Sequence, residues 1–161
     1  MRKIVIILLV INFIIILLMT SVIIGEYKNI GKQFPYLGNT KKESPQDVIK
    51  ENQIIVTKDK VIIYIDNAEW SKYADSHSME PLLSSSANGL EIIPICNKIK
   101  NGDIIVYASK TINELIVHRV IKIEEDKDGL FFTLKGDNNN VVDPEKVRCS
   151  QIKYQVIGII Y

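Results

Sequence analysis

Three short segments of the chain carry side chains that can perform nucleophilic catalysis. The run SHSMEP contains Ser78, the run VHRV contains His118, and the run KGDNNNVVDP contains two carboxylates, Asp137 and Asp143. A serine hydroxyl attacks a carbonyl efficiently only when a base takes its proton, and a carboxylate orients that base. Together the segments predict a serine hydrolase with Ser78 as nucleophile and His118 as general base.

Two other side chains compete for the role of base. His77 adjoins the nucleophile, but neighbouring residues of an extended strand point to opposite sides, so His77 is expected to face away from the partner of Ser78. Lys135 would supply the base of a serine–lysine dyad. Each segment also has a structural explanation, because serines and the Gly-Asp-Asn-Asn run form ordinary turns. The joint occurrence of all three segments favours His118.

Short runs of β-branched and apolar residues must position these side chains. They are separated by turn signals, among them the dipeptide Asp128-Gly129 and a hairpin-forming KDK run. Many short strands with one short helix predict a mainly β fold, a compact antiparallel β domain. The expected strands cover residues 54–56, 61–65, 91–95, 104–107, 115–123, 130–134 and 154–161.

A long apolar run precedes this domain. Residues 4–24 contain no charged side chain, and as a helix they would measure roughly 31 Å, close to the hydrocarbon thickness of a bilayer. The run exceeds the apolar core of a secretory signal and no small-x-small cleavage site follows, so it predicts a retained single-pass anchor. Arg2 and Lys3 favour a cytoplasmic N-terminus, which places the remaining residues on the outer face.

The predicted organisation has three parts: an anchor over residues 1–24, a tether with a short helix over residues 25–52, and a β-rich domain over residues 53–161. The formal net charge of +1, with no helix-turn-helix sequence and no basic patch, predicts no nucleic-acid partner. Cys96 and Cys149 lack the spacing of a metal site and are interpreted as separate thiols, with pairing left open for a domain outside the cell. No metal and no cofactor are expected.

The order of the motifs resembles type I signal peptidases. The runs S-x-S-M-x-P, G-D-I, H-R-V and K-G-D-N-N, followed by an aspartate, are similar to the archaeal and endoplasmic-reticulum branch, whose base is histidine where the bacterial branch has lysine. The resemblance extends from about residue 70 to the C-terminus and implies a β domain of signal-peptidase type. It also implies a serine endopeptidase that cuts leader peptides from exported proteins after small residues. His77 departs from the pattern, because many members have glycine there.

The resemblance assigns a role to each candidate residue. Ser78 matches the nucleophile, His118 the general base, Asp143 the acid of the triad, and Asp137 the other acid of the same loop. Ser76 matches a serine whose hydroxyl would form an oxyanion hole together with the Ser78 N–H.

The resemblance also implies partners. These are the leader peptides of exported proteins, the lipid bilayer and, as a candidate, the translocation machinery. An extended leader is expected to add its backbone to a strand edge formed by Tyr73, Ala74 and Asp75. Residues 84–97 are longer than in compact members, and we expect a hairpin there, with a turn at residues 87–89, near the substrate groove or the membrane.

Two other functions remain open at this point. A repressor-type relative would cleave itself once, in cis, and would show its own product on a gel. A catalytically silent, membrane-tethered β module would bind peptides without turning them over. The combination of Ser78, His118 and Asp143 favours the leader peptidase.

Overall fold

The computed structural model describes residues 12–17, 19–21 and 42–161. The chain divides into two compact units, residues 1–41 and 42–161, which we describe separately. In the first unit the described residues are helical, and the rest of the expected anchor and the expected tether up to Lys41 lie outside the described residues. Within the described ranges, no helix combines the length and the apolar character that crossing a membrane requires.

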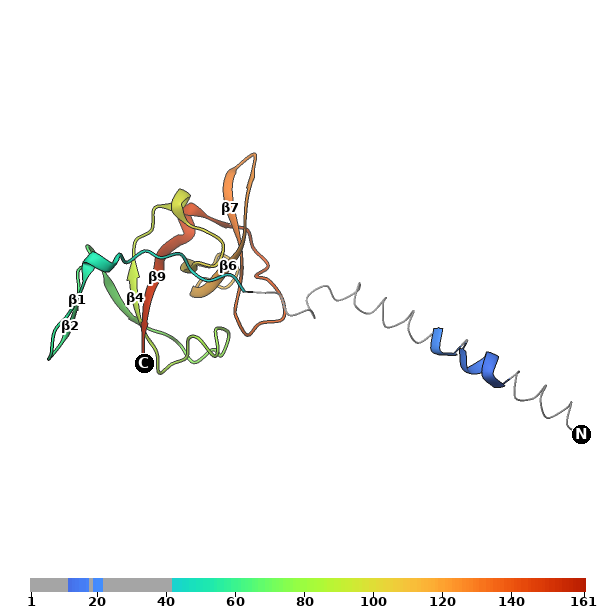
Figure 1. Cartoon of the computed structure of the whole chain (residues 1–161). Helices are drawn as coiled ribbons and strands as arrows, with labels where there is room; N and C mark the ends of the chain where they lie inside the picture. Colours follow the sequence, from blue (N-terminus) through green and yellow to red (C-terminus); the bar gives the residue numbers. More distant parts are fainter. Residues whose placement is uncertain (1–11, 18, 22–41) are drawn as a thin grey trace, which may run out of the picture. The chain divides into compact units, whose positions relative to one another are not determined.

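The regular elements of the second unit are antiparallel strands and three short 3-10 helices, joined by turns and loops (Figure 1). The mainly β, antiparallel fold predicted from the sequence is confirmed. With η denoting a short 3-10 helix, its elements in chain order are η1 (Glu51–Gln53), β1 (Ile54–Val56), β2 (Val61–Ile63), β3 (Glu69–Lys72), β4 (Asn88–Ile92), η2 (Cys96–Lys98), β5 (Ile104–Ala108), β6 (Leu115–Asp126), β7 (Gly129–Lys135), β8 (Val147–Arg148), η3 (Cys149–Gln151) and β9 (Ile152–Ile160).

One sheet organises residues 42–161 and has the strand order β3-β4-β9-β5-β6-β7-β8. Side chains of β5 alternate between two buried clusters: Ile105 and Tyr107 pack in one, and Ile104 and Val106 pack in the other. Because β5 is buried on both faces, it gives rigid support to its neighbour β6, which carries His118.

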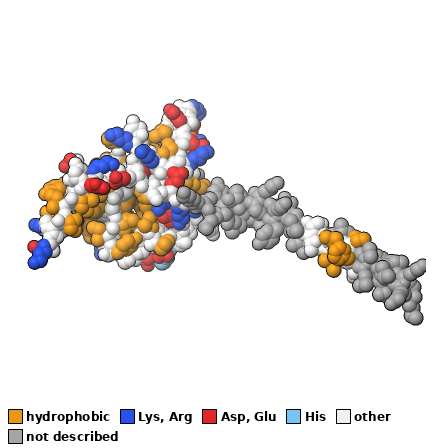
Figure 2. All heavy atoms as spheres, in the orientation of Figure 1, with side chains coloured by type: hydrophobic (Ala, Val, Ile, Leu, Met, Phe, Trp, Pro, Cys, Tyr) orange, Lys and Arg blue, Asp and Glu red, His pale blue; other side chains and the backbone are white. Residues whose placement is uncertain are grey.

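The hairpin of β1 and β2 forms a separate two-stranded sheet. Its strands expose apolar side chains, with Val56 73% and Val61 60% exposed. Figure 2 shows hydrophobic side chains on the surface at this end of the domain. The hairpin therefore presents an apolar surface that no other strand of the described residues pairs with.

The segment before the hairpin lacks the short helix predicted within residues 25–52, as far as that range is described. Residues 42–50 contain no helix, and only the short η1 follows them. The backbone N–H and the side-chain amide of Gln46 both donate to Asp103, which is fully buried. These tertiary hydrogen bonds fix the segment against the sheet, and they outweigh its local helix propensity.

The segment that flanks the serine run also differs from the prediction. The turn expected at residues 87–89 is absent, because β4 begins at Asn88 and pairs with the unpredicted strand β3. The serine run therefore lies in the long connection of a β3–β4 hairpin. Gly89 is required in β4, since a Cβ there would lie 1.8 Å from the hydroxyl of Tyr73.

Cys96 and Cys149 form a disulfide bond, which corrects their interpretation as separate thiols. Their Cα atoms lie 5.6 Å apart although 53 residues separate them in the sequence. No local pattern signals such a pairing, because the approach depends on how η2 and η3 are placed by the sheet.

Reduction of this disulfide is expected to lower the free energy of unfolding by about 4 kcal/mol, because a cross-link over such a loop removes that much chain entropy from the unfolded state in the chain-entropy model. Guanidinium denaturation with and without a reductant measures the change. The Cys96→Ser/Cys149→Ser double variant is the matched control, and its midpoint should not respond to the reductant. An unchanged midpoint in the reduced native protein would contradict the prediction.

Candidate active site

His118 and Asp143 form a buried pair next to a cavity. His118 lies on β6, in register with Ile105 of β5, and its side chain is 7% exposed. Its Nδ1 atom lies 2.8 Å from each carboxylate oxygen of Asp143. A carboxylate oxygen only accepts hydrogen bonds, so Nδ1 carries the proton and Nε2 of the neutral ring is left as the basic nitrogen.

Tyr107 fixes the carboxylate of this pair. Its hydroxyl donates to Oδ2 of Asp143 at 2.8 Å, and the backbone N–H of Asp143 donates to the Leu134 carbonyl at 2.8 Å. Burial, together with the hydrogen bond to Asp143 and its charge, raises the pKa of Tyr107 well above its usual range. The phenol therefore keeps its proton and remains a donor, so Asp143 is oriented before any substrate binds.

The loop that follows β7 packs directly against the serine run. The Ser78 carbonyl accepts a hydrogen bond from the Asn138 N–H at 2.8 Å, and the Asn138 side chain donates to the His77 carbonyl at 3.0 Å. A Cβ at Gly136 would lie 2.6 Å from the Ser78 carbonyl oxygen. Only glycine allows the loop to come this close at position 136. Together these contacts fix the backbone carbonyls of His77 and Ser78, next to the Ser78 hydroxyl.

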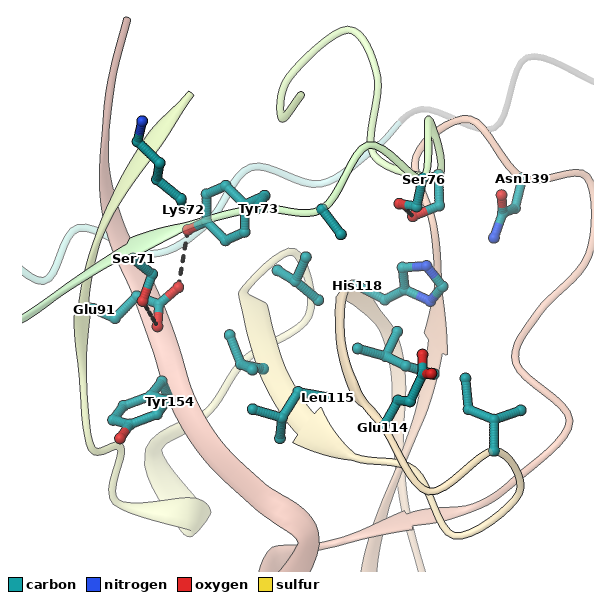
Figure 3. Close-up of a pocket in the computed structure, with 16 residues that line it drawn as sticks. Ser71, Lys72, Tyr73, Ser76, Glu91, Glu114, Leu115, His118, Asn139 and Tyr154 are labelled. Atoms are coloured by element: carbon teal, nitrogen blue, oxygen red, sulfur yellow. Dashed lines mark hydrogen bonds between the residues drawn. The ribbon is translucent and has the colours of Figure 1, made fainter. Parts of the chain in front are cut away.

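Ser78 and His118 line one cavity of about 500 Å³ (Figure 3). Ser76, Tyr73 and Ala74, which the sequence also singled out, line it too. Asp75 is not among the lining residues; its carboxylate accepts a hydrogen bond from Ser85. Asp143 likewise does not line the cavity and reaches it through His118.

Ser78 and His118 share this cavity without a direct hydrogen bond. Within residues 42–161 the Ser78 hydroxyl bonds only to the Ser76 hydroxyl, at 3.1 Å. Hydrogen bonds of catalytic groups often tighten only when substrate is bound. The Ser78 N–H donates to no acceptor among the described residues. That N–H is therefore available to a developing oxyanion, and the Ser76 hydroxyl lies next to the Ser78 hydroxyl, where it could act as a second donor.

Asp137 holds the loop through an ion pair with Arg119. Its two oxygens accept from Nε and Nη2 of Arg119 at 2.8 and 2.7 Å. Both side chains are almost fully buried. Nη1 of Arg119 donates to the carbonyls of Gly102 and Glu43 at 2.8 and 3.1 Å. Asp137 thus ties the loop to β6 and, through Arg119, to the segment that enters the domain.

His77 lies outside the cavity. Its side chain is 64% exposed, and Nδ1 lies 2.8 Å from the Glu80 carboxylate. It takes a positive φ of 58°, so it breaks the extended backbone between the two serines of the run. His77 thus lies away from the cavity as expected, but the extended strand from which this was predicted is absent, because β3 ends at Lys72.

The hydrogen bond that His77 donates to Glu80, then the charges of Glu80 and Asp75, raise the pKa of His77 above its usual 6.5. An NMR titration should show this elevation, and Glu80→Gln should largely remove it. Because the folded-state pKa is raised, the pair stabilises the folded loop below the unfolded pKa, and the stabilisation is lost as pH rises through the folded pKa. Identical titrations of His77 in both proteins would contradict the assignment.

Three residues of the site were not predicted to have a role: Glu91 and Asn139 line the cavity, and Tyr107 bonds to Asp143. Tyr107 and Glu91 are ordinary strand positions, and no sequence signal distinguishes them. Asn139 lies within the Gly-Asp-Asn-Asn run, so the motif itself was the available signal; its side chain lines the cavity beside Ser76 (Figure 3).

Comparison with known proteins gives partial similarities. No protein-family model and no solved structure matches the chain. It is 42% identical over 62 residues to an uncharacterized protein of Methanocaldococcus jannaschii, which covers 38% of the chain and 29% of that protein. It is 32% identical over 85 residues to signal peptidase I W of Bacillus subtilis. The matched residues cover 52% of this chain and 44% of that protein. The chain spans less than half the length of both relatives, and over about half of its own length it is similar to a signal peptidase.

Proposed function

We propose that this chain is a membrane-anchored serine endopeptidase that cleaves leader peptides from exported proteins. The observation that carries the proposal is the buried His118–Asp143 pair, which borders the same cavity as Ser78. The partial similarity to a signal peptidase supports the same reaction class. In this proposal the arrangement is that of the archaeal and endoplasmic-reticulum branch, with histidine as the base.

The proposed reaction is acyl transfer through a covalent intermediate. Nε2 of His118 takes the Ser78 hydroxyl proton as Oγ attacks the scissile carbonyl, and Asp143 stabilises the imidazolium that forms. The oxyanion is held by the Ser78 N–H and the Ser76 hydroxyl. The imidazolium gives its proton to the leaving amine as the peptide bond breaks, which leaves an acyl-enzyme. Water, deprotonated by His118, then releases the acyl group and restores Ser78.

The leader is proposed to bind along the strand edge that continues β3. In the sheet order β3 is terminal and pairs only with β4, so its other edge has no strand partner in the described residues. Residues 73–75 continue this strand toward Ser78, and Ala74 is exposed at the cavity. An extended peptide would add to this edge by backbone hydrogen bonds.

Membrane attachment and location are part of the proposal. Residues 4–24 would serve as a single-pass anchor with the N-terminus in the cytoplasm and the catalytic domain on the outer face. The Cys96–Cys149 disulfide supports this side of the membrane, since disulfides persist in oxidising compartments. Anchoring would raise the effective concentration of substrates held in the same bilayer. The translocation machinery remains a candidate partner.

The proposal is tested by combining the full-length protein in detergent with a fluorophosphonate probe and with leader peptides that have small residues before the cleavage site. Labelling at Ser78 and cleavage of added peptides are expected. A fragment of the protein itself, without cleavage of other chains, would instead identify a self-cleaving relative. Binding of peptides without labelling or turnover would identify a silent binding module.

A further inference from the structure

A buried carboxylate forms one end of the cavity. Glu91 on β4 is only 1% exposed, yet it is one of the lining residues. Its two oxygens accept hydrogen bonds from the hydroxyls of Ser71 and Tyr73, each at 2.9 Å. In Figure 3 this cluster lies across the cavity from His118. The catalytic steps proposed above do not use it.

The charge of Glu91 has no counter-ion in the described part of the chain. No lysine, arginine or histidine of residues 42–161 lies within ion-pair distance of it. Lys72 is the only lysine or arginine among the lining residues, and in Figure 3 its side chain points away from Glu91. A carboxylate has about four acceptor positions, so two hydroxyl donors leave capacity for further donors. Buried charges are ordinarily paired, so this site lacks its partner.

The cluster is rigidly built. Tyr73 packs so closely on β4 that its hydroxyl leaves no room for a side chain at Gly89. Burial, then the charge of Glu91 and the hydrogen bond to it, raises the pKa of Tyr73 well above its usual range, so this phenol stays a donor. With Ser71 on the neighbouring strand β3, Tyr73 holds the carboxylate in one orientation. The site is thus preorganised for a ligand group.

The surroundings indicate which group would fit. The cavity is lined by apolar side chains as well, among them Val106, Leu115 and Val117. The ring of Tyr154 lies at the same end as Glu91 (Figure 3). A lysine or arginine side chain matches this combination, because its methylene stem packs on apolar surface, its cation attracts aromatic rings, and its N–H groups donate to a carboxylate.

We propose that Glu91 forms a specificity subsite that binds a basic side chain of the peptide substrate, away from the scissile bond. The inference rests on the proposed function, because it takes the cavity as a peptide-binding groove. It adds a charge-selective position to a groove whose apolar wall would otherwise select only by size. A hydrogen-bonded charge pair of this kind is expected to change affinity by about ten- to a hundredfold.

Peptide binding to full-length Ser78→Ala protein tests the subsite without turnover. The probes are fluorescent alanine-based decapeptides in which one lysine is moved along the chain, each matched by a peptide with norleucine at the same position. At one position the lysine peptide should bind about ten- to a hundredfold more tightly than its norleucine partner. Adding Glu91→Gln should remove this preference and leave the affinity for the norleucine peptide nearly unchanged.

Glu114→Gln is the matched control, because this exposed carboxylate lines the same cavity and its replacement changes the charge by the same amount. The lysine preference should persist in it. Equal loss in both variants, or a lysine peptide that never binds more tightly than its norleucine partner, overturns the subsite.

If Glu91→Gln fails to fold, the test relies on the native protein alone. The ratio of kcat/KM between the lysine and the norleucine peptide of each pair then decides. A protein that binds no peptide and rejects the fluorophosphonate overturns the proposed function and the subsite together; a reactive protein without lysine preference overturns only the subsite.

Discussion

Ser78→Ala is expected to abolish fluorophosphonate labelling and to lower peptide turnover by about 10⁶-fold, as loss of the nucleophile does in subtilisin. The melting temperature should hardly change, because the Ser78 hydroxyl bonds only to the Ser76 hydroxyl in the described residues. The backbone contacts that fix this turn, including the bond from Asn138 to the Ser78 carbonyl, do not involve the side chain. Turnover and thermal melting of the same preparation measure both effects.

His118→Ala should be as inactive, but it should also be less stable. The imidazole is buried on β6 and bonded to Asp143, so its removal leaves a cavity and takes a donor from a buried carboxylate. His77→Ala is the matched control, because that histidine is exposed and does not line the cavity; it should retain most activity. An inactive His77 variant beside an active His118 variant would overturn the assignment of the base.

The strands were predictable where the signal is local. Runs of β-branched residues correctly indicated β1, β2 and β5 to within two residues of their ends, and Asp128-Gly129 marked the turn before β7, where Gly129 has a φ of +95°. β3 was missed because its sequence, EWSK, contains no β-branched residue. It is a strand because β4 offers it a pairing edge, which is a property of the fold.

The parts of the site that the sequence did not indicate all depend on contacts between distant segments. Tyr107 reaches Asp143 across 36 residues, and Arg119 reaches the Glu43 carbonyl across 76 residues. The disulfide and the Glu91 cluster are of the same kind. Motifs identified the residues whose chemistry is distinctive, whereas the groups that orient them are common residues in common positions.

The two acids of the loop should respond differently to the same isosteric change. Asp143→Asn is expected to lower turnover by about 10⁴-fold, in analogy with serine-protease triads, with little change in melting temperature. In the native protein both oxygens of Asp143 act as acceptors, one of them for Tyr107 and both for Nδ1 of His118. An asparagine offers only one acceptor oxygen, and its NH₂ group would face one of these donors. If Tyr107 keeps the oxygen, the amide donates to Nδ1 and forces the proton onto Nε2, which removes the base from the cavity.

Asp137→Asn should instead destabilise the domain by about 3–5 kcal/mol, because it leaves the buried guanidinium of Arg119 without its counter-charge. Turnover should then fall in proportion to the folded fraction, since Asp137 bonds to Arg119 and not to His118 among the described residues. Melting temperature and turnover of both variants, measured at a temperature where each is folded, separate the two roles. An Asp137 variant that is stable but inactive, beside an active Asp143 variant, would reverse the assignment. Such a result would make Asp137 the residue that orients the base and would leave the Tyr107–Asp143 contact as a structural feature of β5.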